Sequence, residues 1–265
     1  LSDIVVTEAG FGADLGAEKF IDIKCRESGL RPDAIVLVAT IRALRYHGGV
    51  NVKEIGEKNI DAVRKGIENL EKHIENVKLF GLTPIVAINK FANDSQEEID
   101  FVKESCKSLG VKVFDLEVWA KGSQGAIDIA KEIEKNIQTK EEVNFLYDKE
   151  ASIEDKVTTI AMQLYGAKKV EFSSKASSEI KNINELGLSS LPICMAKTQK
   201  SISDDPNLRA RPKDFTFKVR DVEISSGAGF IIPIAGEMML MPGLPEIPSS
   251  ENIDIDNEGN IVGLF

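Results

Sequence analysis

Four short apolar runs, each bounded by turn-forming or polar residues, mark the first half of the chain. They cover residues 3–7, 34–40, 83–89 and 112–118. Each run is rich in β-branched residues and is apolar throughout rather than at every second position, which is typical of strands buried on both faces of a parallel sheet. The hydrophobic pattern therefore predicts four parallel strands.

Amphipathic helices are predicted between and after these runs. Apolar residues recur at spacings of three and four over residues 62–77 and 97–109, so that each segment has one apolar face. A third helix is expected at residues 126–136, after the last run. Because strands and helices alternate, we expect a mostly parallel, doubly wound α/β sheet, whose ligands bind beyond the carboxyl ends of the strands.

The pattern changes after residue 140. The elements predicted there are helices at 152–165 and 176–185, an alternating strand at 214–219 and a C-terminal hairpin that turns at 257–260. We therefore expect two domains, an α/β domain over residues 1–140 and a smaller α+β domain over residues 141–265.

Composition and charge narrow the function classes. The net charge of −10 argues against nucleic-acid binding, because phosphate backbones attract basic surfaces. The 3 cysteines lie far apart and the chain has 2 histidines, which argues against a cysteine or histidine metal site and against a Ser-His-Asp triad. We expect reduced thiols in a cytoplasmic protein.

The segment EAGFGADLGAEKF, residues 8–20, follows the first apolar run and places Phe11 in a turn of glycines and alanines. Glycine adds no side-chain bulk and tolerates positive φ, so such a turn lets backbone amides approach a ligand closely. An exposed Phe11 would favour a flat ligand lying against its ring. The alternative is an ordinary strand-to-helix connection with Phe11 turned into the core.

Two further aromatic residues, Phe91 and Trp119, stand just beyond the third and fourth predicted strands. Rings from neighbouring strand ends, together with Phe11, can form a slot for a planar heterocycle, since offset stacking contributes on the order of 1 kcal/mol per contact. Alternatively, all three rings plug the end of the sheet against the second domain, because pockets and cores share the same aromatic lining.

The stretch NKFAND, residues 89–94, carries Asn89 and Lys90 and resembles the NKxD base-reading element of P-loop GTPases, but Asp94 lies too late in it. A polar strand-end loop is the alternative. The phosphate-binding motif GxxxxGK[ST] is absent from the sequence. An isolated P-loop hydrolase is therefore excluded unless such a loop lies upstream of residue 1, and a GTPase-like domain is a weak alternative.

Residues 192–206, PICMAKTQKSISDDP, concentrate polar side chains between apolar segments. Such a loop, bounded by two prolines, is either solvated or presents donors to an anionic ligand. Its candidate groups include Lys197, Ser203, Asp204 and Asp205.

Several segments together resemble the formate–tetrahydrofolate ligases. These segments are TEAGFGADLGAEKF, VAINKF, EVWAKG, LPICMAKTQKSISDDP and GAGFI, and they occur in the family's order. The resemblance covers roughly the C-terminal half of that family's chain. It implies a P-loop-NTPase-like α/β fold and an ATP-dependent ligase, in which formate and ATP give formyl phosphate and N10 of tetrahydrofolate then takes the formyl group.

The resemblance also assigns residues to the site. Phe91 and Trp119 match the aromatics that hold the family's pterin ring, with Phe11 close by. Residues that could face the nucleotide are Asn89, Lys90, Lys197, Ser203, Asp204 and Asp205. Glu8 or Asp14 could support Mg²⁺ from behind its direct ligands, or could be solvated or capping groups. The P-loop lysine has no counterpart, so no catalytic residue is assigned.

The family further implies Mg²⁺, a monovalent cation (K⁺ or NH₄⁺) and a homotetramer. Because the P-loop is missing from the sequence, we expect a P-loop-bearing N-terminal half as partner and no ATP turnover by this chain alone. A non-catalytic interaction or assembly module with an empty slot is the alternative from another class.

Overall fold

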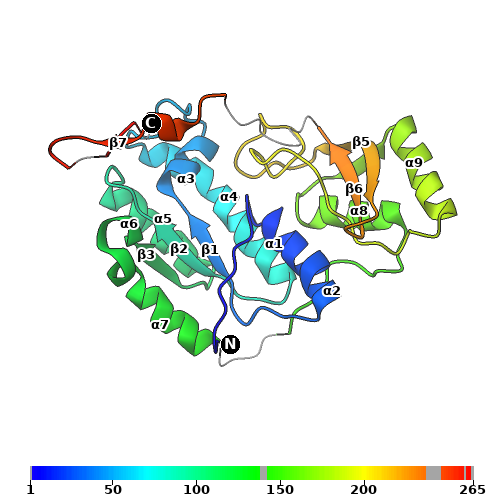
Figure 1. The fold of residues 1–265 in the computed structure, drawn as a ribbon, viewed down its shortest axis with the longest axis horizontal. Helices are drawn as coiled ribbons and strands as arrows, with labels where there is room; N and C mark the ends of the chain where they lie inside the picture. The colour runs from blue at the N-terminus through cyan, green and yellow to red at the C-terminus, as the bar shows by residue number, and fades with distance from the viewer. Residues whose placement is uncertain (1, 138–141, 237–245, 260, 264–265) are drawn as a thin grey trace.

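The structure is a computed structural model that describes residues 2–137, 142–236, 246–259 and 261–263 (Figure 1). The described chain contains three sheets, ordered β1-β2-β3, β4-β5-β6 and β7-β8, and helices lie between the strands. The predicted α/β class is confirmed. The predicted domain boundary at residue 140 lies in a gap between the described ranges.

The first sheet contains three of the four predicted strands. They are β1 (Val36–Ala39), β2 (Ile85–Asn89) and β3 (Val113–Leu116), and both neighbouring pairs are parallel. β2 is central and buried along most of its length, as its unbroken apolar run predicts. The carboxyl ends of all three strands therefore lie at one edge of the sheet.

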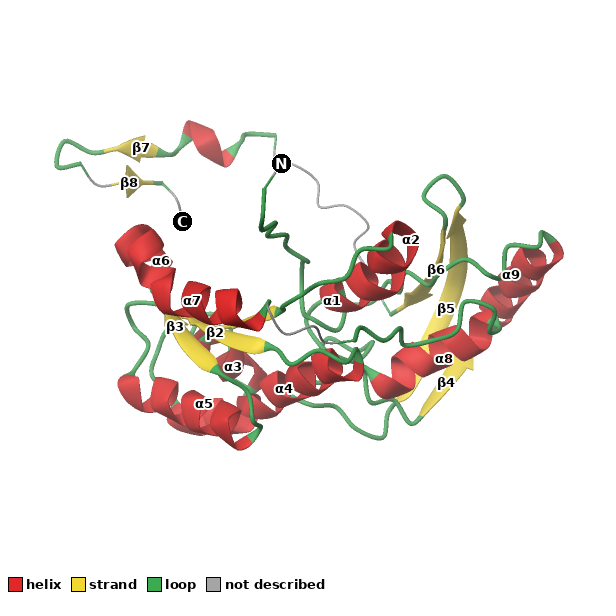
Figure 2. Cartoon of the chain, turned by 90° about the horizontal axis from the view of Figure 1, so that it is seen from below, coloured by secondary structure: helices red, strands yellow, loops and turns green. Residues whose placement is uncertain are grey.

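Helices cover both faces of this sheet (Figure 2). Their bounds are α3 Ile41–His47, α4 Ile60–Leu79, α5 Gln96–Ser108 and α7 Ile127–Asn136. Leu37 and Val86 pack with apolar residues of α3, α4 and α5, whereas Ile85 and Ala87 pack with Ile129 of α7 on the opposite face. The three helices that periodicity predicts are present, while the short α3 was not predicted.

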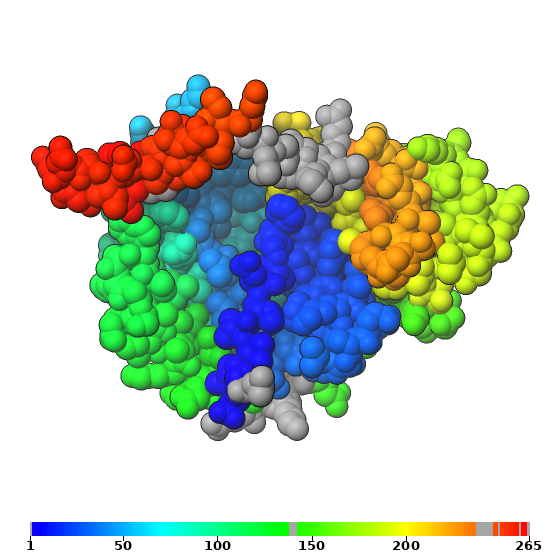
Figure 3. Space-filling model, in the orientation of Figure 1, coloured from blue at the N-terminus to red at the C-terminus, as the bar shows by residue number. Residues whose placement is uncertain are grey.

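The first apolar run, residues 3–7, is not a strand, and this prediction is wrong. Ile4, Val5 and Val6 are exposed, and the run pairs with no strand in the described part of the chain. β-branched residues favour extended backbone, but a strand also needs a neighbour that accepts its hydrogen bonds. The N-terminal segment instead runs over the surface, coloured dark blue in Figure 3.

A helical segment that was not predicted follows this surface run. It comprises α1 (Gly16–Lys19), a π-helical stretch η1 (Phe20–Cys25) and α2 (Arg26–Ser28). It ends at Gly29, which has φ 73° and so adopts a left-handed conformation that glycine tolerates.

The second sheet is mixed. β4 (Lys169–Phe172) pairs in parallel with β5 (Thr216–Ser225), and β5 pairs antiparallel with β6 (Phe230–Ala235). The predicted strand at 214–219 is confirmed and continues further, whereas β4 was not predicted. The helices α8 (Ile153–Gln163) and α9 (Ser174–Glu185) match the two predicted in this region.

The core around this second sheet draws on both halves of the sequence. Tyr165 and Phe217 lie in it, with ring centroids 5.4 Å apart. Ile21 of η1 and Val77 of α4 belong to the same cluster of buried residues. The segment 16–28 and the end of α4 therefore pack against the second sheet, so both halves of the chain share this core.

The remaining elements are short. They are α6 (Val118–Lys121), the 3₁₀ helices η2 (Gly122–Ala126) and η3 (Ser249–Glu251), and the strands β7 (Asp254–Ile255) and β8 (Ile261–Val262). The antiparallel pair β7–β8 confirms the predicted C-terminal hairpin, although residue 260 of its turn is outside the described residues. Among the helices that the structure describes, none combines the length and apolar character needed to cross a bilayer. All three cysteines are free thiols.

Candidate functional site

The candidate site lies at the carboxyl edge of the β1–β3 sheet. Phe91 follows β2, and Trp119 belongs to α6, which follows β3. Because β2 and β3 are parallel neighbours, both aromatics leave the sheet at the same edge. Phe91 is 38% exposed and Trp119 is 92% exposed, so the alternative in which these rings plug the core is wrong.

Phe91 has a cationic neighbour that the sequence reasoning missed. The guanidinium of Arg42 lies 4.1 Å from the centroid of the Phe91 ring. Such a cation is attracted by the negative face of an aromatic ring. Arg42 belongs to α3, which follows β1, so three strand ends contribute Arg42, Phe91 and Trp119 to one edge. In the sequence, only the polar residues that directly follow β1 indicated that Arg42 could belong to the site.

Phe11 is exposed as well, at 73%, and is not turned into the core. It has φ 61°, a left-handed conformation that is uncommon outside glycine. Since residues 3–7 form no strand, Phe11 is carried by a surface turn rather than by a strand end. Within the described residues, the rings of Phe11, Phe91 and Trp119 do not stack on one another.

The small residues of this turn are required by close packing. A Cβ atom at Gly12 would lie 2.3 Å from Asp14 Oδ1, and a Cβ atom at Gly16 would lie 2.3 Å from the carbonyl oxygen of Gly10. Neither position admits a side chain without displacement of its neighbour. The glycines thus let the turn fold tightly against the start of α1.

Asp94 holds the loop that carries Phe91. Its Oδ2 accepts a hydrogen bond from the backbone N–H of Phe91 at 2.9 Å, and its Oδ1 lies 3.9 Å from Arg45 Nη2. The Asp94 side chain is shielded from solvent, and burial raises its pKa. The Asp94 carboxylate is therefore engaged within the protein, and the GTPase-like domain stays the weaker alternative.

Asn89 and Lys90 lie at the same edge as Phe91. Asn89 is the last residue of β2 and is half-buried. Lys90 Nζ lies 3.8 Å from Asp115 Oδ2 and 3.7 Å from Glu117 Oε1, both from the end of β3. The charge of Lys90 is thus partly neutralised within the protein, and a nucleotide-facing role for either residue stays a prediction.

Lys197 and Ser203 are turned inward. Lys197 Nζ lies 2.7 Å from Asp14 Oδ2 and donates a hydrogen bond to the carbonyl of Ser201 at 2.6 Å. The Ser203 hydroxyl lies 2.9 Å from that of Ser201, and both hydroxyl groups are buried. These contacts hold the loop at 192–206 together. The side chains of Lys197 and Ser203 are therefore buried inside the loop and do not line its surface.

Asp204 and Asp205 are structural groups of the same loop. Asp204 Oδ2 accepts a hydrogen bond from the backbone N–H of Lys218 on β5 at 3.1 Å. Asp205 Oδ1 accepts from the backbone N–H of Asn207 at 2.9 Å, which closes a turn. A contact of either carboxylate with a nucleotide stays a prediction.

Glu8 and Asp14 lie in different environments, and a supporting role for either behind the direct ligands of Mg²⁺ stays a prediction. Glu8 is exposed on the surface segment, whereas Asp14 is buried and paired with Lys197. In the described ranges no group of three or more His, Cys, Asp or Glu side chains could hold a metal ion. We therefore name no direct ligand of Mg²⁺ among the described residues.

The two histidines are structural. His47 Nδ1 accepts a hydrogen bond from the backbone N–H of Ala210 at 3.2 Å, and burial lowers the pKa of His47 to about 4. His73 Nδ1 lies 3.9 Å from Asp14 Oδ1, and burial lowers the pKa of His73 although Asp14 opposes the shift. Both rings favour the neutral form more than a solvated histidine does.

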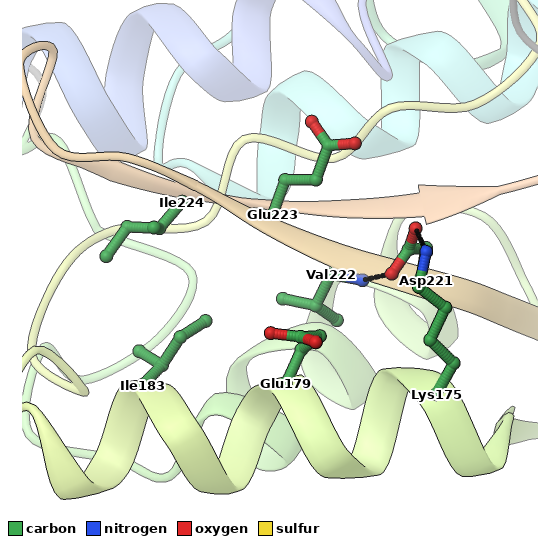
Figure 4. A pocket seen from close by; sticks show the side chains of 7 residues that line it. All are labelled: Lys175, Glu179, Ile183, Asp221, Val222, Glu223 and Ile224. Atoms are coloured by element: carbon green, nitrogen blue, oxygen red, sulfur yellow. Dashed lines mark hydrogen bonds and ion pairs between the residues drawn. The ribbon is translucent and has the colours of Figure 1, made fainter.

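A separate hollow of about 400 Å³ lies between α9 and β5 (Figure 4). Lys175 of α9 reaches across to Asp221 of β5, with Nζ 2.6 Å from Oδ2. The hollow belongs to elements other than those that carry Phe91 and Trp119, and we do not include it in the candidate site.

Comparison with protein-family models adds an independent result. Residues 1–265 match the family described as formate–tetrahydrofolate ligase, so the match extends over the chain from its first residue to its last. It also includes the turn with Phe11, the loop with Phe91 and the helix with Trp119. The chain therefore belongs to the formate–tetrahydrofolate ligase family.

Proposed function

We propose that this chain provides the tetrahydrofolate-binding part of an ATP-dependent ligase. The ligase joins formate to tetrahydrofolate through formyl phosphate and gives 10-formyltetrahydrofolate. The family membership supports the reaction class. The observation that carries the assignment to this chain is the exposure of Phe91 and Trp119 after two neighbouring parallel strands.

The pteridine ring of the folate lies against Phe91 and Trp119 in this proposal, with Phe11 closing the slot from the surface turn. Exposed aromatic rings are costly in water, and a planar ligand removes that apolar area from solvent. Stacking adds about 1 kcal/mol per ring beyond the area effect. Arg42 keeps one face of Phe91 occupied, which leaves the other face for the ligand.

Such a slot contributes to formyl transfer by positioning. The attacking amine N10 is held near the formyl carbon, so that a bimolecular step becomes effectively unimolecular. The bound folate also keeps water from formyl phosphate, which would otherwise be hydrolysed. The residues of this chain bind and orient the acceptor, while ATP supplies the energy for the ligation.

We propose that ATP is bound mainly by a P-loop-bearing portion whose motif this sequence lacks. A further strand from that portion could pair with the first sheet, because the edge of β1 opposite β2 pairs with no described strand. Val36 and Val38 of β1 are 37% and 60% exposed, and Figure 3 shows the surface recessed beside the N-terminal segment. A further strand and helix docked here would bury those valines. This chain alone is then inactive.

The family resemblance also supports a homotetramer in the cytoplasm that needs Mg²⁺ and is activated by K⁺ or NH₄⁺. These properties belong to the proposal for the complete enzyme. We assign neither cation to a residue described here.

Trp119 is the only tryptophan, which makes binding directly measurable. Titration of the chain with tetrahydrofolate should quench its fluorescence saturably, after correction for absorbance with free N-acetyltryptophanamide. 4-Aminobenzoylglutamate, which lacks the pteridine, should quench far less. Absence of saturable quenching, both in this chain and in the complete enzyme, would reject the folate-binding role and favour the interaction module.

A further inference from the structure

A buried ion pair joins the Phe11 turn to the second half of the molecule. Asp14, four per cent exposed, lies between that turn and α1, and Lys197, fully buried, lies in the loop at 192–206. Their charged atoms, Asp14 Oδ2 and Lys197 Nζ, are 2.7 Å apart. Burial raises the pKa of Asp14, but Lys197 and His73 outweigh this effect, and the pKa stays below its usual value.

Lys197 is a firmly held anchor. Its Nζ donates hydrogen bonds to the carbonyl oxygens of Ser201 and Thr198, at 2.6 Å and 3.2 Å. It also lies 4.8 Å from the centroid of the Tyr165 ring. The preceding residue, Ala196, forms a β-bridge with Ile234 of β6. The ammonium group is thus fixed relative to the second sheet.

Asp14 lies inside the tightly packed turn that follows Phe11. Its Oδ1 lies so close to Gly12 that a Cβ atom there would come within 2.3 Å of it. The carbonyl of Gly12 accepts hydrogen bonds from the backbone N–H groups of Leu15 and Gly16, at 3.0 Å and 2.9 Å. Asp14 thus lies within the turn that these hydrogen bonds close, two residues after Gly12 and three after Phe11.

A buried ion pair is a poor device for stability alone, because desolvation of the two charges offsets most of their attraction. An apolar pair of similar volume would stabilise the fold about as well. What a buried ion pair adds, with its lysine held by two further hydrogen bonds, is a defined geometry. Here that geometry connects an exposed aromatic residue on a surface turn to the core of the second sheet.

We propose that Asp14 and Lys197 form a positioning pair that sets the location of Phe11, and thereby the affinity of the enzyme for tetrahydrofolate. This inference rests on the proposed folate-binding function. Neither residue touches the substrate. The pair acts through the backbone of residues 11–14 and holds Phe11 in the conformation that closes the slot.

The test uses the full-length enzyme and measures KM and kcat for each substrate in D14N and K197M. We expect KM for tetrahydrofolate to rise roughly tenfold to a hundredfold, the cost of a small misplacement, while KM for ATP and formate changes little. In the double variant D14L/K197M, thermal stability should recover because no buried charge remains unpaired. Its KM for tetrahydrofolate should stay high.

R211M is the matched control. Arg211 forms a two-fold hydrogen-bonded ion pair with Glu75 of α4, at 2.8 Å and 2.6 Å, which also joins the two halves but does not involve the turn. This variant should leave KM for tetrahydrofolate unchanged. Amide hydrogen exchange over residues 9–16 should accelerate in D14N and not in R211M, a readout that does not depend on turnover.

F11A separates this inference from the function on which it depends. If F11A leaves KM for tetrahydrofolate unchanged in an active enzyme, the proposed role of Phe11 in folate binding fails. If F11A raises KM but the pair variants lose only stability, or D14L/K197M regains the wild-type KM, the positioning role is overturned. Unchanged exchange over residues 9–16 in D14N would overturn it as well.

Discussion

Arg45 and Glu98 form a two-fold hydrogen-bonded ion pair inside the α/β half of the molecule. Arg45 Nε lies 2.9 Å from Glu98 Oε1, and Arg45 Nη2 lies 2.6 Å from Glu98 Oε2, with both side chains shielded from solvent. Glu98 also accepts hydrogen bonds from the backbone of Asn59 and Ser95, which begin α4 and α5. The pair therefore ties three helices together beneath the loop that carries Phe91.

Replacement of Glu98 should strongly destabilise the protein. E98Q removes the directly hydrogen-bonded counter-charge of the buried Arg45 guanidinium and leaves only Asp94, 3.9 Å away. Loss of one partner of a buried pair costs about 3–5 kcal/mol. K112M is the control, because Lys112 pairs with Glu132 at the surface, where an ion pair contributes about 0–1 kcal/mol. Urea unfolding monitored by circular dichroism gives both values. Equal losses in the two variants would contradict the structural role of the Arg45–Glu98 pair.

Glu18 should make stability fall as pH rises. Neither carboxylate oxygen of this buried residue has a hydrogen-bond partner, and burial raises its pKa from 4.5 to about 8. The folded state therefore holds a proton that the unfolded state releases between these values. The contribution of Glu18 is complete below pH 4.5 and is lost as the pH rises through 8.

The measurement compares unfolding free energies of wild type and E18Q at acid and at mildly alkaline pH. Because Gln cannot ionise, E18Q should lose less stability than wild type over this range. E27Q, a change at an exposed glutamate of α2, should retain the wild-type slope. A slope in E18Q equal to that of wild type would show that Glu18 does not hold the proton.

The two glycines that flank Phe11 should respond differently to alanine. G12A places a methyl group against the Asp14 carboxylate, whereas a Cβ atom at Gly10 meets nothing within 4 Å. We expect G12A to lower the free energy of unfolding by about 1–3 kcal/mol, as overpacking does, and G10A to change it little. Thermal unfolding of both variants tests this, and equal melting temperatures would contradict the close packing of the turn.

Loss of either strand-end aromatic should weaken folate binding selectively. F91A and W119A each remove one stacking contact of about 1 kcal/mol together with apolar area, so KM for tetrahydrofolate in the full-length enzyme should rise roughly fivefold or more. KM for ATP should be less affected. F101A is the control, because Phe101 also has an arginine over its ring, Arg64 at 5.9 Å, but lies on α5 outside the site.

Local pattern was sufficient for many elements. The apolar periodicity located α4 and α5 to within two residues at each end, since both helices bury one face and both begin at a side chain that caps them, Asn59 and Ser95. The strand β5 was recognised from its alternation of apolar and polar residues, because it too buries one face. The four-residue strand β4 was missed because so short a segment contains little pattern.

The candidate site was predictable only in part. The sequence could place Phe91 and Trp119 at one edge of the sheet, because the ends of neighbouring parallel strands share an edge. The position of Arg42 over Phe91 was not predictable, since a polar residue after a strand can point in many directions. The roles of Lys197 and Asp14 were also missed, because buried and exposed charges look alike in a sequence.

The sequence by itself determined the α/β class, the parallel core strands and the aromatic residues at their carboxyl ends, because each of these follows from local hydrophobic pattern. Only the tertiary structure decided that residues 3–7 form no strand and that Asp14 pairs with Lys197. A strand needs a neighbour and a buried charge needs a partner. Both requirements are met, or left unmet, by segments that come together only when the chain folds.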